Sequence, residues 1–155
     1  MALDRGLEHL KKFGLEDRVM LFPVSSATVA EAALAIGCEE AHIAKTMSFL
    51  VGEDAILIVA AGDTKIDNSK FKATFHVKAK MIPAEEVEAR IGHAVGGVCP
   101  FGINEGVAVY LDESLKRFET VYPACGTDAS GVRLSVPELE RSSGSRGWID
   151  VCKLR

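Results

Sequence analysis

The chain has 155 residues, of which 48% are hydrophobic and 26% charged, as in an ordinary globular domain. This length predicts a single domain over 1–155, and a net charge of −4 argues against a protein that coats DNA. The longest apolar run, 55–61, is too short for a membrane span, and the charged N-terminus is unlike a secretory signal. We therefore expect a cytoplasmic protein that does not bind membranes.

The first half of the chain predicts alternating helices and strands, each bounded by a local signal. In order, these are a helix over 3–13, a strand over 19–22, a helix over 26–35, strands over 46–51 and 55–61, and a helix over 68–75. Thr28 and Glu31 have the spacing of a capping box. Gly52 begins the hairpin turn between the two longer strands, and Asp67 or Asn68 caps the third helix.

The second half predicts shorter elements separated by glycines and prolines. In order, these are a strand over 78–82, a helix over 84–91, strands over 107–111, 119–124 and 132–136, a short helix from 137, and a strand over 148–152. About seven strands and five flanking helices, joined by both hairpins and crossovers, predict an α/β or mixed α+β fold. We expect a mixed, largely antiparallel sheet or a partial barrel.

The segment Gly96-Gly97-Val98-Cys99-Pro100-Phe101-Gly102 is the most informative part of the chain. Three glycines and a proline in seven residues exclude a helix or a central strand. Such a loop can bring backbone N–H groups close to a ligand, where they form a concave anion-binding site. The alternative is an irregular connection with no ligand.

Together with this loop, four other motifs in order resemble one family. They are Ile43-Ala44-Lys45-Thr46, the segment 58–67 that contains Gly62-Asp63-Thr64, Leu111-Asp112-Glu113-Ser114-Leu115, and a glycine near Gly126. The chain resembles, over about 26–153, the YbaK/ProX/EbsC family of aminoacyl-tRNA deacylases, the editing module associated with prolyl-tRNA synthetase. The resemblance implies a hydrolase that removes the amino acid from a mischarged tRNA, Cys- or Ala-tRNA(Pro), without a metal or organic cofactor.

The resemblance gives Lys45 the closest tie to activity, in contact with the aminoacylated 3′ end of tRNA. We interpret the backbone of Gly96, Gly97 and Gly102 as an oxyanion hole for the ester carbonyl. The expected substrate-binding residues are Thr46, Phe49, Asp63, Cys99, Pro100 and Phe101. Among these, Asp63 would pair with an α-ammonium or a basic group, and the two phenylalanines would form the pocket walls. From the residues alone, Lys45 could equally extend from the edge of the core, and Asp63 could simply end a strand.

Two other functional interpretations remain open at this point. Cys99 could be a nucleophile, with His93 six residues away as its base. The chain could instead be a non-catalytic module that binds a tRNA 3′ end or a synthetase. No C-x-x-C pair or glycine-rich nucleotide motif is present, so we expect no metal and no nucleotide cofactor.

The expected partners are aminoacyl-tRNA, held by its single-stranded 3′ end, and prolyl-tRNA synthetase. Five lysines fall between positions 65 and 80, against one acidic residue, Asp67. This segment is either a solvated face of the domain or a surface that contacts RNA phosphates.

Overall fold

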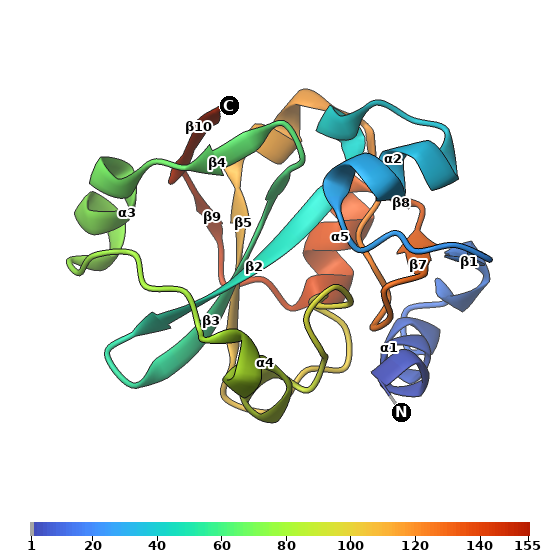
Figure 1. The fold of residues 1–155 in the computed structure, drawn as a ribbon, viewed down its shortest axis with the longest axis horizontal. Helices are drawn as coiled ribbons and strands as arrows, with labels where there is room; N and C mark the ends of the chain where they lie inside the picture. Colours follow the sequence, from blue (N-terminus) through green and yellow to red (C-terminus); the bar gives the residue numbers. More distant parts are fainter. Residues whose placement is uncertain (1) are drawn as a thin grey trace.

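A computed structural model describes residues 2–155 of the chain (Figure 1). Its five α-helices are α1 (Ala2–Lys11), α2 (Val29–Ile36), α3 (Asn68–Phe75), α4 (Ala84–Ile91) and α5 (Val136–Ser143). Its strands are β1 (Val19–Leu21), β2 (Ala44–Val51), β3 (Asp54–Ala61), β4 (Thr64–Ile66), β5 (Ala108–Asp112), β6 (Thr120–Val121), β7 (Ser130–Val132), β8 (Leu134–Ser135), β9 (Trp148–Ile149) and β10 (Cys152–Leu154). Short 3-10 turns occupy Glu16–Arg18, Glu40–His42 and Glu113–Arg117.

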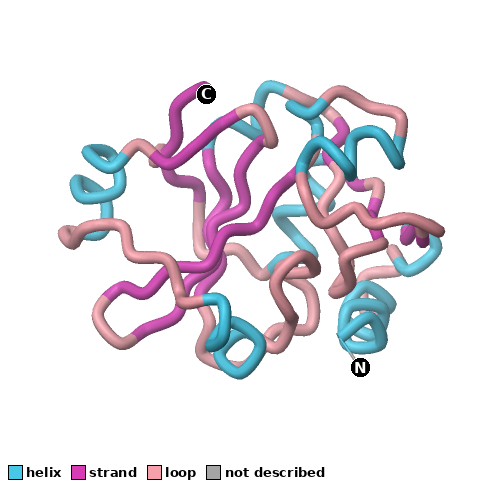
Figure 2. The backbone as a smooth tube through the Cα atoms, in the orientation of Figure 1, coloured by secondary structure: helices cyan, strands magenta, loops and turns pink. Residues whose placement is uncertain are grey.

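The centre of the fold is a four-stranded mixed sheet in the order β2-β3-β5-β9. β2 and β3 form an antiparallel hairpin, whereas β5 runs parallel to both β3 and β9. Three two-stranded antiparallel pairs, β1-β7, β4-β10 and β6-β8, lie around it. Figure 2 shows that α3 lies on one side of the sheet and α5 on the other, with loops covering much of the remaining surface.

The two faces of the sheet bury two separate cores because side chains alternate along a strand. Leu57, Val59 and Ala61 of β3 belong to the larger core, which includes side chains from α1, α4 and α5. Ile56 and Ile58 belong to the smaller core, beneath α3. The register of β2 on β3 therefore decides which face each β2 side chain occupies, and β2 is the edge strand beside the candidate site.

Local capping signals fix both ends of α2, which borders the site, and the start of α3. The Thr28 side chain accepts from the Glu31 N–H while Glu31 binds back to Thr28, so the predicted capping box is present at the start of α2. Gly37 ends that helix in the left-handed conformation. Asp67 caps α3, accepting from the N–H groups of Ser69 and Lys70. These bonds satisfy N–H groups that a helix start leaves unpaired.

The structure confirms the predicted α/β class, its mixed sheet arrangement and its five helices, but it changes the strands of the second half. The predicted strand 78–82 is wrong: this segment reaches β2 only through an isolated bridge between Met81 and Phe49 and two hydrogen bonds. The predicted strand 119–124 is shorter, because only β6 (Thr120–Val121) is a strand there. The predicted strand 148–152 is interrupted between β9 (Trp148–Ile149) and β10 (Cys152–Leu154). Short strands need tertiary partners for their hydrogen bonds, so residue pattern alone does not set their limits.

Within residues 2–155, no helix is both long and apolar enough to cross a membrane.

Candidate active site at the edge of strand β2

A cavity of about 410 Å³ lies beside the free edge of β2. One side is formed by the start and inner face of α2, and the opposite side by α4 and the first part of the glycine loop. Its lining residues are Ser26, Ala27, Thr28, Val29, Ala32, Ile36, Ile43, Ala44, Lys45, Thr46, Met47, Ser48, Met81, Ile82, Ala84, Val87, Val95, Gly96, Val98, Tyr122, Pro123, Ala124, Ser130 and Gly131. Most are apolar, and Lys45 is the single charged residue among them.

The edge of β2 is paired at both ends and open in the middle. The Ala44 N–H donates to the Tyr122 carbonyl, and the Ser48 carbonyl accepts from the Ile82 N–H. Thr46 lies between them with the same orientation, so its N–H and C=O also point away from β3. Among residues 2–155 these two groups have no partner, and the buried Thr46 hydroxyl has none either. This cavity wall therefore offers unused donors and acceptors.

Lys45 lines the same cavity as Thr46 and Gly96, but its side chain starts on the opposite face of the sheet. Its ammonium donates to the carbonyl of Thr64 in β4. Burial lowers the pKa of Lys45 below the ordinary lysine value, and the charge of Arg155 lowers this pKa further. The cation is thus half-buried beside the cavity and already bound to one acceptor.

Asp63 lies outside the cavity lining, and its carboxylate is bound to Arg117. Its carboxylate accepts two bonds from the Arg117 guanidinium, at 2.6 and 3.0 Å. These bonds lower the pKa of Asp63, although partial burial opposes the shift. The electrostatic attraction between Asp63 and Lys45 favours the charged lysine. Asp63 therefore belongs to the charged surroundings of Lys45, and a basic residue of the chain occupies its carboxylate.

The first two glycines of the loop lie at the cavity. Gly96 lines it with a φ of 94°, a conformation that favours glycine. Gly97 packs directly on the Gly126–Thr127 backbone, where an added Cβ would lie 2.7 Å from backbone atoms. The Gly97 N–H donates to the Ala94 carbonyl. Within residues 2–155, the N–H groups of Gly96 and Val98, which both line the cavity, have no such partner.

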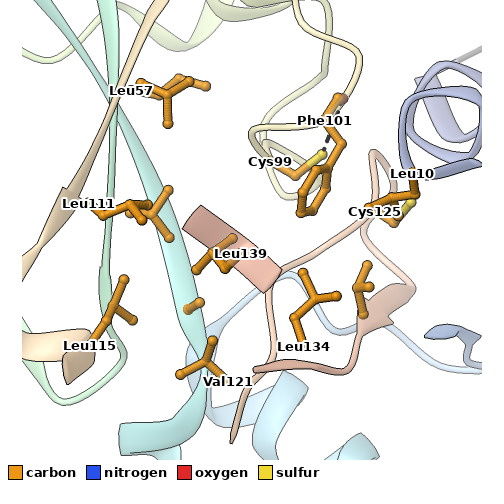
Figure 3. Close-up of a cluster of buried hydrophobic side chains, with 14 of the residues drawn as sticks. Leu10, Leu57, Cys99, Phe101, Leu111, Leu115, Val121, Cys125, Leu134 and Leu139 are labelled. Carbon is orange, nitrogen blue, oxygen red and sulfur yellow. Dashed lines mark hydrogen bonds between the residues drawn. The ribbon is translucent and has the colours of Figure 1, made fainter. Parts of the chain in front are cut away.

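The second half of the loop turns away from the cavity and into the larger core (Figure 3). Cys99 and Phe101 are fully buried there, near Leu10 and Leu139. Pro100 is also buried, and neither it nor Gly102 lines the cavity. Gly102 instead packs against the α1 backbone at Arg5, which leaves no room for a side chain. The expected substrate contacts of Cys99, Pro100 and Phe101 are therefore corrected to core packing.

Cys99 lacks the surroundings of a nucleophile. Its sulfur lies 3.5 Å from His93 Nε2, but that nitrogen lies 2.6 Å from the Phe101 carbonyl and so donates its proton there. Burial strongly raises the pKa of the Cys99 thiol and lowers the pKa of His93. A protonated thiol beside a neutral imidazole, both closed off from the cavity, is a structural pair.

Phe49 also lies outside the cavity, on the far face of β2. Its ring packs against Phe71 with 5.2 Å between centroids. The predicted wall of Phe49 and Phe101 is thus replaced by aliphatic side chains, among them Ile36, Val87 and Val98.

Several polar cavity residues were missed from the sequence. Ser26 is buried and bonds to the carbonyls of Asp128 and Ser130. Ser130 accepts from the Cys125 N–H and lies four residues after the motif glycine Gly126. The lining contains no His, Cys, Asp or Glu. Throughout residues 2–155, no cluster of three such side chains is arranged to hold a metal ion.

The cavity, its half-buried lysine and its glycine loop lie within a recognised domain. The model of the aminoacyl-tRNA editing domain matches residues 24–142, and the chain belongs to this family. Its members are aminoacyl-tRNA deacylases, which act on charged tRNA and are related to the editing domains of prolyl-tRNA synthetase.

Two proteins and one solved structure illustrate the similarity. The chain is 50% identical over 154 residues to the uncharacterized protein YwhH of Bacillus subtilis, covering 99% of this chain and 98% of that protein. It is 25% identical over 114 residues to EbsC of Enterococcus faecalis, named as a candidate Cys-tRNA(Pro)/Cys-tRNA(Cys) deacylase, covering 72% and 68% of the two chains. A crystal structure described as a candidate trans-editing enzyme for prolyl-tRNA synthetase aligns with a TM-score of 0.88 and 30% identity, over 98% and 97% of the chains.

Proposed function

We propose that this protein is a trans-editing hydrolase that deacylates mischarged Cys- or Ala-tRNA(Pro). The observation that carries the proposal is the shared cavity of Lys45, Thr46 and Gly96 in a domain of the editing family. A synthetase pocket excludes a smaller side chain by only about 1–3 kcal/mol, so a second site is needed to remove the misacylated product. The name of EbsC supports cysteine as the substrate amino acid.

In this proposal the unused backbone groups hold the ester. The N–H groups of Gly96 and Val98 polarise the scissile carbonyl and stabilise the oxyanion that forms on it. The outward C=O of Thr46 accepts from the α-amino group of the aminoacyl ester, with the Thr46 hydroxyl oxygen beside it as a second acceptor. Because the lining has no carboxylate, these neutral acceptors must serve the amino group.

Lys45 supplies the one positive charge at the cavity. It leaves the Thr64 carbonyl and contacts the tRNA 3′ end beside the ester, which offers it a stronger, anionic partner. The aliphatic walls limit the size of the amino acid side chain.

The attacking group comes from solvent or substrate: a water, the neighbouring ribose hydroxyl, or the substrate's own side chain. Serine hydroxyls line the cavity, but no imidazole or carboxylate is there to activate them. Attack at the carbonyl carbon breaks the acyl C–O bond, and the ribose oxygen leaves with a proton. The amino acid is released, directly or after hydrolysis of an intermediate.

The test is release of radiolabelled amino acid from a panel of aminoacyl-tRNAs. The wild-type protein should act on Cys- or Ala-tRNA(Pro) and spare Pro-tRNA(Pro). We expect Lys45→Ala to lower kcat/KM by about 10²–10³-fold, and Cys99→Ala to retain activity if it folds, as circular dichroism would verify. Full activity of Lys45→Ala would refute the site, and loss of activity in folded Cys99→Ala would favour the thiol route.

A non-catalytic module that binds the tRNA 3′ end is the second candidate. The Lys45 ammonium favours it, because this group is bound to Thr64 and not directed at Gly96. This alternative predicts that wild-type protein protects the ester of bound Cys-tRNA(Pro) from spontaneous hydrolysis, whereas the deacylase accelerates its loss.

A further inference from the structure

Four of the five lysines between 65 and 80 are exposed and have no ion-pair partner within the described chain. They are Lys65, Lys72, Lys78 and Lys80, joined in β10 by Lys153. The fifth, Lys70, pairs with Asp150 at 3.0 Å and also donates to the Cys152 carbonyl. We call these five exposed residues (Lys65, Lys72, Lys78, Lys80 and Lys153) the lysine surface. They gather on α3, the loop after it and the neighbouring β4–β10 pair, at one side of the molecule (Figure 1).

Two of these lysines face each other across a strand pair. Lys65 of β4 is directly opposite Lys153 of β10 in the antiparallel register. Like charges opposite each other destabilise a strand pair. Asp67, the one acidic residue between positions 65 and 80, caps α3 with its carboxylate and also interacts electrostatically with Lys153. Five exposed lysines against this one carboxylate leave an excess of positive charge here, although the net charge of the chain is −4.

The lysine surface begins at the rim of the cavity. The Lys80 carbonyl accepts from Leu50 on β2, and the next residue, Met81, lines the cavity while remaining 60% exposed. Farther from the rim, Lys72 and Lys78 line a second hollow with Asn68, Ser69 and Ala79. Cations and small polar groups thus follow one another from the cavity mouth to α3.

At the cavity rim, the charge of the exposed side chains changes from positive to negative within five residues, from Lys80 to Glu85. Beyond Met81, helix α4 contributes Ala84 and Val87 to the cavity but exposes Glu85 and Glu88 to solvent. A polyanion whose end enters the cavity is repelled on the α4 side and attracted on the Lys80 side. The charge pattern therefore defines a direction of approach as well as a binding surface.

We infer that the lysine surface binds the phosphates of the tRNA acceptor end, so that the RNA leaves the cavity over Lys80 toward α3. This inference rests on the proposed function, because it places the 3′ end in the cavity. The ligand chemistry is a run of phosphate groups, which lysines bind without reading sequence. An acidic protein is the competing occupant, and the test separates the two.

The first experiment measures binding of uncharged tRNA(Pro) by fluorescence anisotropy between 50 and 200 mM NaCl. The variant Lys72→Gln/Lys78→Gln/Lys80→Gln is compared with Lys11→Gln/Lys12→Gln/Arg141→Gln, which removes the same charge from exposed positions at the C-terminal end of α1, in the turn after it and on α5. Each lost phosphate contact lowers the slope of log K against log salt by about 0.7–0.9. We expect the first variant to lose about two units of slope and at least tenfold in affinity at 50 mM NaCl, and the control to match wild type.

The second experiment distinguishes an effect on tRNA binding from an effect on ester hydrolysis. The lysine-surface variant should raise KM for aminoacyl-tRNA while leaving hydrolysis of 3′-aminoacyl-adenosine unchanged. Equal tRNA affinity and salt dependence in the two triple variants would overturn the inference and leave the surface to an acidic protein. Failure of wild type to hydrolyse any aminoacyl ester would instead overturn the proposed function, whereas the binding result would stand on its own.

Discussion

The cavity beside β2 is lined mainly by aliphatic side chains and contains one half-buried cation, whereas the lysine surface carries five exposed cations. Low exposure strengthens each polar contact in the cavity, so a few backbone groups can select a small ligand. Exposed charges are screened by salt and bind an extended polyanion without selecting its sequence. The difference indicates a division of labour: changes in the cavity should alter turnover, and changes on the lysine surface should alter RNA affinity.

After Lys45→Ala, the largest effect is expected from Gly96→Ala. The new Cβ would lie 3.3 Å from the Cβ atoms of Ala27 and Asp128, at a φ of 94° that alanine adopts only at a cost of about 1–2 kcal/mol. We expect kcat/KM for deacylation to fall by about 10²-fold, because the N–H groups of Gly96 and Val98 move. Steady-state kinetics on this variant measure turnover at the cavity, and fluorescence anisotropy with tRNA measures binding to the lysine surface.

Gly52→Ala is the matched control for that change. Gly52 also has a positive φ, 64°, but it lies in the β2–β3 turn, where an added Cβ would meet no atom within 4 Å. The melting temperature of the Gly52→Ala variant should fall by about 2–4 °C for each kcal/mol of strain, and its deacylation kcat/KM should stay unchanged. If Gly52→Ala lost turnover as severely as Gly96→Ala, general destabilisation would explain both, and the special role of the loop would fail.

A smaller effect with opposite signs is expected from Thr46→Val. This change removes a buried hydroxyl that has no partner, so the protein should gain about 1 kcal/mol of stability. Deacylation should slow by about 5- to 10-fold, because the same hydroxyl would bind the aminoacyl group. Chemical denaturation and single-turnover kinetics provide the two readouts.

Thr64→Val is the control for the predicted change in the stability of Thr46→Val. The Thr64 hydroxyl is buried and donates to the Ala61 carbonyl at 2.7 Å, so its removal should cost about 1 kcal/mol. If Thr46→Val destabilised the fold as much as Thr64→Val, the Thr46 hydroxyl would be satisfied in solution and would not be reserved for a ligand.

The pH dependence of turnover should report on Lys45. Its pKa is lowered, chiefly by burial and then by Arg155, so the lysine loses its charge at a lower pH than an ordinary lysine. After subtraction of spontaneous ester hydrolysis, kcat/KM should fall on the alkaline side as the cation is lost. Arg155→Gln removes a neighbouring positive charge, so it should raise the pKa of Lys45 and shift this limb to higher pH.

Lys45→Arg provides the control for that titration. A guanidinium stays charged throughout the accessible range, so any activity that the variant retains should lose the alkaline limb. An unchanged limb in Lys45→Arg would assign the titration to another group.

Local signals in the sequence predicted more of the fold than of the site. The Thr28 capping box and the Asp67 cap act within three residues, and both are present. The site depends on the sheet instead: only the β2–β3 register shows that Phe49 faces the smaller core while Thr46 faces the cavity side. Arg117, which binds Asp63, is 54 residues away in the chain, and no local pattern links the two.

The smallest effect is expected from thiol alkylation. Burial raises the pKa of every cysteine, to about 11 for Cys125 and about 12 for Cys152, and Cys38 is the only partly exposed one of the four. Iodoacetamide at pH 8 should label the native protein slowly at Cys38, as peptide mass mapping would show, and leave deacylation and tRNA binding intact. Cys38→Ser should abolish this labelling without loss of activity. Inactivation that follows labelling of Cys99 would instead mean that the loop opens far enough to expose its core half, and the separation between cavity and core would then be lost.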